Sequence, residues 1–181
     1  MHGLVSLLDQ EHSDQIEILW AMLETRCGLT GIKVTPFPHF SWLIADDFAW
    51  PELEGALQGL AEKLSPFRVR TTGIGIFSSE RPVIFIPVVR TTVLDSLHAQ
   101  IWEIFQPHAS GISDYYSSDR WVPHISLAYS DVTTQNIGCV MKALARQDFD
   151  WEIEINNISL IHEPAGTVGT LRYHFSLAEH T

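Results

Sequence analysis

Short apolar stretches alternate along the chain with segments in which apolar residues recur every three or four positions. In the first half this pattern predicts strands at 3–8, 34–45 and 67–77 and helices through 16–27 and 53–64. The second half predicts strands at 83–89, 121–129, 149–161 and 171–177, helices through 94–105 and 137–144, and a polar loop at 107–120. Strands and helices therefore alternate in the same manner in both halves.

The two halves also carry aromatic residues at matching positions. Two such pairs are 82 positions apart: Trp20 with Trp102, and Phe67 with Phe149. Weak internal duplication is the simplest account of this repeat. We therefore predict an α+β fold in which residues 1–181 form a single domain. It would consist of two pseudo-symmetric lobes, approximately 1–81 and 82–181, joined through one core, with a cleft between them.

The closest match between the halves lies within two predicted strands. The matching segments are Pro38-His39-Phe40-Ser41-Trp42-Leu43 and Pro123-His124-Ile125-Ser126-Leu127-Ala128. Because side chains alternate between the two faces of a strand, His39 shares a face with Ser41, and His124 shares a face with Ser126. If a pseudo-twofold axis relates the lobes, the two pairs face each other across one cleft. Two imidazoles and two hydroxyls around one centre would suit a phosphate group.

Two further His-x-Ser sequences occur, and neither has this duplicated context. His108 precedes Ser110 in the polar loop, where no strand holds the geometry. His174 precedes Ser176 in a predicted strand, but the alignment of the halves sets it opposite Phe85. Histidines that are only structural remain the alternative for His39 and His124, and the shared position in each half favours function.

These motifs, the two-lobed order of elements and the chain length together resemble the 2H phosphoesterase superfamily. That superfamily includes the bacterial 2'-5' RNA ligases and the 2',3'-cyclic phosphodiesterases. The resemblance implies that each lobe has an antiparallel sheet with helices on its outer side. It also implies that His39 and His124 form the catalytic pair, that Ser41 and Ser126 hold the phosphate, and that no metal or other cofactor is needed.

The residues account for this chemistry without the family. Opening a 2',3'-cyclic phosphate requires removal of a proton from water and donation of a proton to the departing ribose oxygen. Histidine, with an ordinary pKa near 6.5, can do either near neutral pH. The two histidines must then hold opposite protonation states, which predicts a bell-shaped dependence of rate on pH. Ser41 and Ser126 could donate hydrogen bonds to the phosphate oxygens, and neither is predicted to be a nucleophile.

The loop before the second motif offers candidates for substrate binding. Arg120 could contact a phosphate, and Tyr115 and Tyr116 could stack against a base. An exposed loop with incidental aromatic residues is the alternative. Trp42, on the opposite face of its strand from His39, is predicted to lie in the core.

Composition limits the choice of partners. There are 22 acidic and 11 basic residues, a formal net charge of −11, so we expect no long nucleic-acid track but a nucleotide or RNA-end substrate. No apolar stretch is long enough for a membrane span, and no secretion signal is recognised at the start. The only cysteines, Cys27 and Cys139, are predicted to be buried free thiols, in keeping with a cytoplasmic location.

The sequence therefore predicts a metal-independent phosphodiesterase that acts on 2',3'-cyclic phosphate or 2'-5' phosphodiester bonds. Three alternatives stay open. One is 2'-5' ligation through the same site, and another is a non-catalytic module that binds nucleotides or RNA ends. The third is a metallohydrolase with His39 and His124 as ligands, for which two histidines without a nearby carboxylate or cysteine would be an incomplete ligand set. The oligomeric state is left undetermined.

Overall fold

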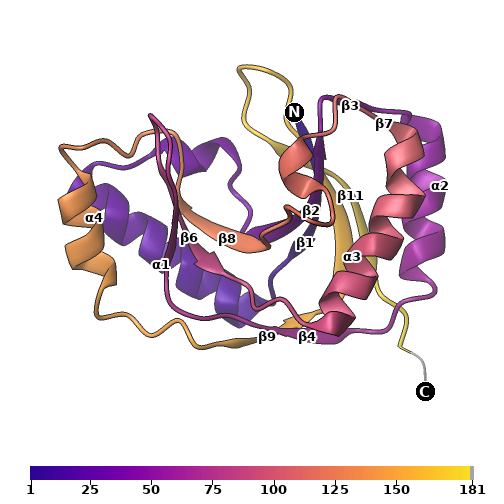
Figure 1. Ribbon diagram of the computed structural model, residues 1–181, viewed down its shortest axis with the longest axis horizontal. Coiled ribbons are helices and arrows are strands. Elements are labelled where there is room, and N and C mark those ends of the chain that lie inside the picture. The colour runs from indigo at the N-terminus through magenta and orange to yellow at the C-terminus, as the bar shows by residue number, and fades with distance from the viewer. Residues whose placement is uncertain (180–181) are drawn as a thin grey trace.

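Seven strands form one antiparallel sheet in the computed structural model, which describes residues 1–179 (Figure 1). Their order across the sheet is β11-β10-β1-β2-β8-β6-β5. These strands are β1 (His2–Leu7), β2 (His39–Ala45), β5 (Gly75–Phe77), β6 (Val83–Pro87), β8 (His124–Ala128), β10 (Asn157–His162) and β11 (Thr170–Ser176). Two smaller antiparallel pairs join β3 (Asp47–Phe48) to β7 (Ala109–Ser110) and β4 (Phe67–Arg70) to β9 (Glu152–Ile155).

The large sheet has two parts that meet at a single registered pair, Phe40 with Ile125. One part is β11-β10-β1-β2 and the other is β8-β6-β5. Each part combines strands from both halves of the sequence, because β10 pairs with β1 and β5 pairs with β6. The structure thus confirms the α+β fold with antiparallel sheets, while the division of the chain near residue 81 stays a prediction.

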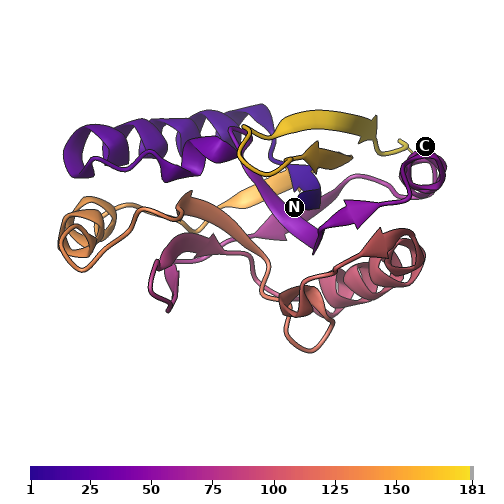
Figure 2. The ribbon, with the colours of Figure 1, turned by 90° about the horizontal axis from the view of Figure 1, so that it is seen from above.

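Within residues 1–179, four α-helices flank the sheets in two pairs (Figures 1 and 2). The pairs are α1 (Gln10–Cys27) with α4 (Ile137–Leu144), and α2 (Trp50–Ala61) with α3 (Thr92–Phe105). Helix α1 also packs against β8, α2 against β10 and β11, and α3 against β2. None of the helices in residues 1–179 is long and apolar enough to cross a membrane.

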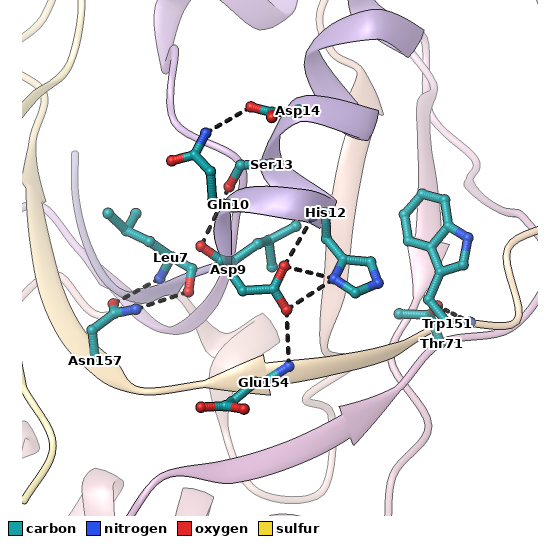
Figure 3. Close-up of polar contacts among 11 residues, drawn as sticks. Leu7, Asp9, Gln10, His12, Ser13, Asp14, Thr71, Trp151, Glu154 and Asn157 are labelled. Carbon is teal, nitrogen blue, oxygen red and sulfur yellow. Dashed lines mark hydrogen bonds and ion pairs between the residues drawn. The ribbon is translucent and has the colours of Figure 1, made fainter.

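The N-terminus of α1 is fixed by one carboxylate (Figure 3). Asp9 caps the helix by accepting a hydrogen bond of 2.9 Å from the backbone N–H of His12, and it accepts another from the His12 imidazole. The backbone N–H of Glu154 donates to the same carboxylate at 3.1 Å. Asp9 therefore joins the start of α1 to β9. At the other end, Gly28 adopts the left-handed conformation, which confirms the predicted end of the helix.

The core follows the alternation of side chains along the central strands. Phe40 and Trp42 on β2 are 0% and 1% exposed, so Trp42 is a core residue as predicted. The indole of Trp42 donates a hydrogen bond of 2.9 Å to Ser6 Oγ, which in turn donates to the carbonyl of Asn157. The buried indole N–H of Trp42 and hydroxyl of Ser6 are thereby satisfied.

Four predicted strands prove shorter than expected. The segment 67–77 is divided into β4 and β5, with Gly73 at φ +51° between them, and 149–161 is divided into β9 and β10. The reason is that β4 and β9 leave the large sheet and pair with each other. Strand β2 begins only at His39 because residues Gly31–Val34 form a 3-10 helix, and β8 begins only at His124. A period of two persists across such changes of partner, so the sequence pattern does not reveal them.

The prediction of two free thiols is wrong. Cys27 and Cys139 form a disulfide bond that links the end of α1 to α4. The cysteines are 112 positions apart, but the packing of α1 against α4 brings their Cα atoms to 5.8 Å. Spacing along the chain contains no information about this long-range contact. Free thiols therefore no longer support a cytoplasmic location, which stays a prediction.

Candidate active site

Both His-x-Ser motifs line one cavity of about 680 Å³. His39 and Ser41 come from β2, and His124 and Ser126 come from β8. The antiparallel pairing of Phe40 with Ile125, extended by one residue in each direction, sets His39 opposite Ser126 and Ser41 opposite His124. Phe40 and Ile125 themselves are buried in the core on the other face. The structure thus brings together the four residues that the sequence singled out.

Each motif is held at its serine by a tryptophan from elsewhere in the chain. The Trp121 indole donates a hydrogen bond of 3.0 Å to the carbonyl of Ser41, and the Trp20 indole donates one of 3.1 Å to the carbonyl of Ser126. Trp121 is fully buried and stacks on His98, with ring centroids 3.9 Å apart. The two strands are therefore positioned by equivalent contacts, although Trp121 is not the residue that the sequence alignment matched with Trp20.

The two catalytic candidates expose the same ring nitrogen. His39 Nδ1 hydrogen-bonds to the carbonyl of Phe37, and His124 Nδ1 to the carbonyl of Val122 at 2.7 Å. Because a carbonyl oxygen can only accept, Nδ1 carries the proton in both residues. In the neutral form of either ring, Nε2 then has a free lone pair. Each imidazole is therefore oriented by a carbonyl just before its own strand, through Nδ1 and not through Nε2.

The surroundings lower the pKa of both histidines, and in His39 the charge of the other ring contributes to the lowering. Burial lowers the pKa of His39 to about 4, with a further contribution from the charge of His124, against the opposing effect of the Phe37 carbonyl. Burial also lowers the pKa of His124, and the Val122 carbonyl opposes it. The two rings are thus electrostatically unequal despite their matching motifs.

Two phenylalanine rings pack against the imidazole of His124. The ring centroids of Phe77 and Phe85 lie 4.9 and 5.1 Å from that of His124, and the two phenylalanines stack on each other. A Cβ atom at Gly75 would come within 2.4 Å of the Phe85 ring. Glycine at position 75 therefore leaves room for the ring that packs against His124.

Ser41 has a neighbour that the sequence analysis did not connect with it. It is 8% exposed, and its side chain lowers the pKa of the Tyr116 phenol against the larger, opposite effect of burial. Burial raises the pKa of Tyr116 to about 12, so this phenol stays protonated and can act as a donor. Tyr116 lies in the 3-10 helix Asp114–Tyr116, whose start is tied to β2 by a hydrogen bond from Ser113 N to the carbonyl of Ile44. The stacking of a base on Tyr116 stays a prediction.

The other loop candidates lie at the cavity as well. Arg120 is the only lysine or arginine among the described residues that line it. Its guanidinium lies over the ring of Tyr115, 4.8 Å from the centroid, and Tyr115 is 70% exposed. By contrast, neither His108 nor His174 lines the cavity. Within residues 1–179 no group of three or more His, Cys, Asp or Glu side chains is arranged to hold a metal ion.

A family model described as the 2'-5' RNA ligase superfamily matches residues 34–167, which include both motifs. The chain belongs to the 2'-5' RNA ligase superfamily. Among solved structures, the chain is similar to TT0787 of Thermus thermophilus, with a TM-score of 0.67, 19% identity and 99% of each chain covered. It is also similar to Usb1 of Kluyveromyces marxianus, with a TM-score of 0.54, 11% identity, and 97% of this chain and 96% of that one covered. At these identities the two structures support the shared fold. A comparison with curated proteins found no match.

This member of the 2'-5' RNA ligase superfamily has a cavity that extends beyond the two motifs. Further lining residues, which the sequence analysis did not single out, include Gly3, Thr35, Phe77 and Glu163. They lie far from the motifs in sequence or carry no repeat, so neither periodicity nor duplication could have indicated them. Membership of the superfamily supports a phosphodiesterase or ligase type of activity for the site as a whole.

Proposed function

We propose that the protein is a metal-independent phosphodiesterase acting on 2',3'-cyclic phosphate or 2'-5' phosphodiester bonds of nucleotides or RNA ends. The observation that carries the proposal is the pair of imidazoles in one cavity, each with its Nδ1 committed to a backbone carbonyl and its Nε2 free. Hydrolysis of such a bond requires a general acid and a general base on two sides of one phosphate.

His39 is the general base in this proposal and His124 the general acid. The charge of a protonated His124 contributes to the lowered pKa of His39, so His39 is taken as the ring that is neutral while His124 is protonated. His39 Nε2 takes a proton from water as the water oxygen bonds to phosphorus. His124 Nε2 gives its proton to the ribose oxygen as the bond from phosphorus to that oxygen breaks. Exchange of protons with solvent then restores both histidines.

Ser41 and Ser126 donate hydrogen bonds to the non-bridging phosphate oxygens, where charge develops in the transition state. Neither serine is the nucleophile, because each lies parallel to its histidine on the same face of a strand and is poorly placed to pass it a proton. Tyr116, whose phenol stays protonated beside Ser41, can donate to the Ser41 hydroxyl. Arg120 supplies a positive charge beside the phosphate.

The substrate in this proposal is small. Arg120 is the only lysine or arginine among the described cavity residues, and the net charge of the chain is −11. Long RNA would need many phosphate contacts along its track, whereas a mononucleotide or a short terminus needs few. No long nucleic-acid track and no membrane partner are therefore proposed.

The deciding experiment measures turnover of a panel of 2',3'-cyclic nucleotides and 2'-5'-linked dinucleotides in the presence of a chelator. We expect His39→Ala and His124→Ala each to lose at least about a hundredfold in kcat, because each removes one proton-transfer partner. Glu103→Ala is the matched control, since Glu103 is exposed on α3 and away from the cavity. Thermal unfolding of each variant shows whether the fold is retained.

Four other outcomes would contradict the proposal, and three of them would indicate a different function. Wild-type rates in either histidine variant would contradict the two-histidine mechanism. Activity that disappears with chelator would point to a metallohydrolase. Tight binding of cyclic nucleotides without turnover would indicate a binding module, and joining of RNA ends in place of hydrolysis would indicate a ligase.

A further inference from the structure

The cavity continues from the two motifs along β1 toward the end of β10. In the sheet, Val5 lies opposite Ser41, and Gly3 lies opposite both Ile44 and Ile161. Gly3 is two residues along β1 from Val5, or about 7 Å, and one strand spacing of about 5 Å from β2. The backbone of Gly3 is therefore about 9 Å from that of Ser41. That separation is comparable with the reach from a ribose phosphate to its own base.

Gly3 lets two apolar side chains pack closely over the backbone in this part of the cavity. A Cβ atom at Gly3 would come within 3.0 Å of Ile44 Cδ1 and 3.3 Å of Val5 Cγ1, so it would project into the space among these side chains. Glycine weakens the interior of a strand, and it occurs there where another group must approach the backbone closely. Here the approaching groups are the Ile44 and Val5 side chains, and together with Ile161 they make this end of the cavity apolar. We call this apolar end of the cavity the slot.

Glu163 lines the cavity at the end of this slot. The hydroxyl of Thr35 donates a hydrogen bond of 2.7 Å to Glu163 Oε2. The turn after Glu163 packs against the same segment, because Gly169 N donates to the carbonyl of Val34 at 2.7 Å. The amino group of Met1 is hydrogen-bonded to the Glu163 backbone carbonyl. Among the described residues Glu163 Oε1 has no hydrogen-bond partner, so the carboxylate is positioned and can still accept.

We propose that this slot, formed by Gly3, Ile44, Ile161, Thr35 and Glu163, binds the guanine base of the substrate nucleotide. The assignment rests on the proposed function for the reaction itself. An ionised carboxylate only accepts hydrogen bonds. Guanine presents a ring N–H beside an amino group, so two donors meet the carboxylate. Adenine and cytosine present an amino group beside an acceptor, and uracil presents one N–H between two carbonyls, so each would set an acceptor against Glu163.

The test measures kcat/KM for the 2',3'-cyclic phosphates of guanosine, adenosine, cytidine and uridine. The wild-type protein should favour guanosine over uridine by about tenfold or more, the discrimination typical of a bidentate contact. Glu163→Gln keeps an oxygen that can accept from Thr35 but replaces the other by a donor. This variant should lose most of the preference through a higher KM for guanosine, with kcat nearly unchanged. Glu103→Gln, on the exposed side of α3, should retain the preference.

A second measurement separates the slot from the reaction. Binding of guanosine and uridine 3'-monophosphates is measured by calorimetry with the wild-type protein and with Glu163→Gln, and needs no turnover. Guanosine binding that depends on Glu163, without turnover of any cyclic nucleotide, would support the slot and contradict the proposed function. Equal rates for all four bases, or a guanosine preference unchanged in Glu163→Gln, would overturn the slot alone. Absence of both turnover and base-dependent binding would overturn both.

Discussion

His39 and His124 carry the same side chain in matching motifs but lie in different surroundings. Burial lowers the pKa of both rings against the opposing effect of a backbone carbonyl, and the charge of His124 contributes to the lowered pKa of His39, which is about 4. Unequal surroundings allow two identical residues to take opposite roles in one reaction. The repeated motif predicts a pair, and the effect of His124 on His39 is the basis of the proposed assignment of acid and base.

The pH dependence of the reaction follows from this assignment. The base must be neutral, so kcat/KM should rise as the pH increases through about 4, the pKa of His39. The acid must be protonated, so kcat/KM should fall as the pH increases through the lowered pKa of His124, below its ordinary 6.5. We expect a bell-shaped profile with its maximum between these limits, measured on a 2',3'-cyclic nucleotide.

Stability must be followed at each pH of that profile. Both histidines have a folded-state pKa below the unfolded value of 6.5, so their neutral forms favour the fold above pH 6.5 and stability decreases as the pH falls toward 4. Circular dichroism at each pH therefore distinguishes lost catalysis from unfolding. A rate that keeps rising above pH 7 would contradict the assignment of His124 as the acid.

At the scale of elements, the start of α1 depends on Asp9. Its carboxylate accepts from the backbone and imidazole of His12 and from the backbone of Glu154, and so fixes the helix to β9 (Figure 3). Burial alone would raise the pKa of Asp9, but these hydrogen bonds outweigh it and the pKa lies below the ordinary 3.8. The ionised form therefore stabilises the fold.

We expect Asp9→Ala to lower the free energy of unfolding by about 1 to 2 kcal/mol at pH 7, as loss of a helix cap does. Urea denaturation measures the change. Because the contribution is present above the unfolded pKa and is lost as the pH falls through the lower folded pKa, the difference from wild type should shrink below pH 3.8. The control Glu17→Ala, exposed on the same helix, should change stability by less than about 0.5 kcal/mol. An equally stable Asp9→Ala would contradict the role of the cap.

At the scale of the whole molecule, one covalent link connects distant parts of the chain. The disulfide between Cys27 and Cys139 closes a loop across 112 positions and fastens α1 to α4. Ile32 and Thr35, which follow the end of α1, line the cavity, as does Tyr129, which precedes α4. The link therefore supports the segments that form one wall of the site.

The double variant Cys27→Ser with Cys139→Ser should have a free energy of unfolding about 4 kcal/mol lower than that of the oxidised wild type, because a long loop in the unfolded chain is no longer closed. Urea denaturation with and without a reducing agent measures this difference. The reducing agent should destabilise the wild type and leave the double variant unchanged. Equal stability of reduced and oxidised wild-type protein would show that the link contributes nothing.

Much of the site could be predicted because it depends on local geometry. The period of a strand puts His39 beside Ser41 and His124 beside Ser126 on one face, whatever the rest of the chain does. The repeat then indicates that two such strands belong together. The four α-helices follow for a similar reason, since their apolar residues recur at helical spacing.

Contacts between distant segments were decided only by the tertiary structure. The disulfide, the departure of β4 and β9 from the large sheet, and the hydrogen bond from Trp121 to Ser41 each join residues about 80 or more positions apart. The same holds for Glu163 and Thr35, which meet because the turn after β10 packs beside the segment that precedes β2. Sequence periodicity records which face a side chain occupies, whereas its partner across the molecule depends on how all the elements pack, and no local pattern encodes that packing.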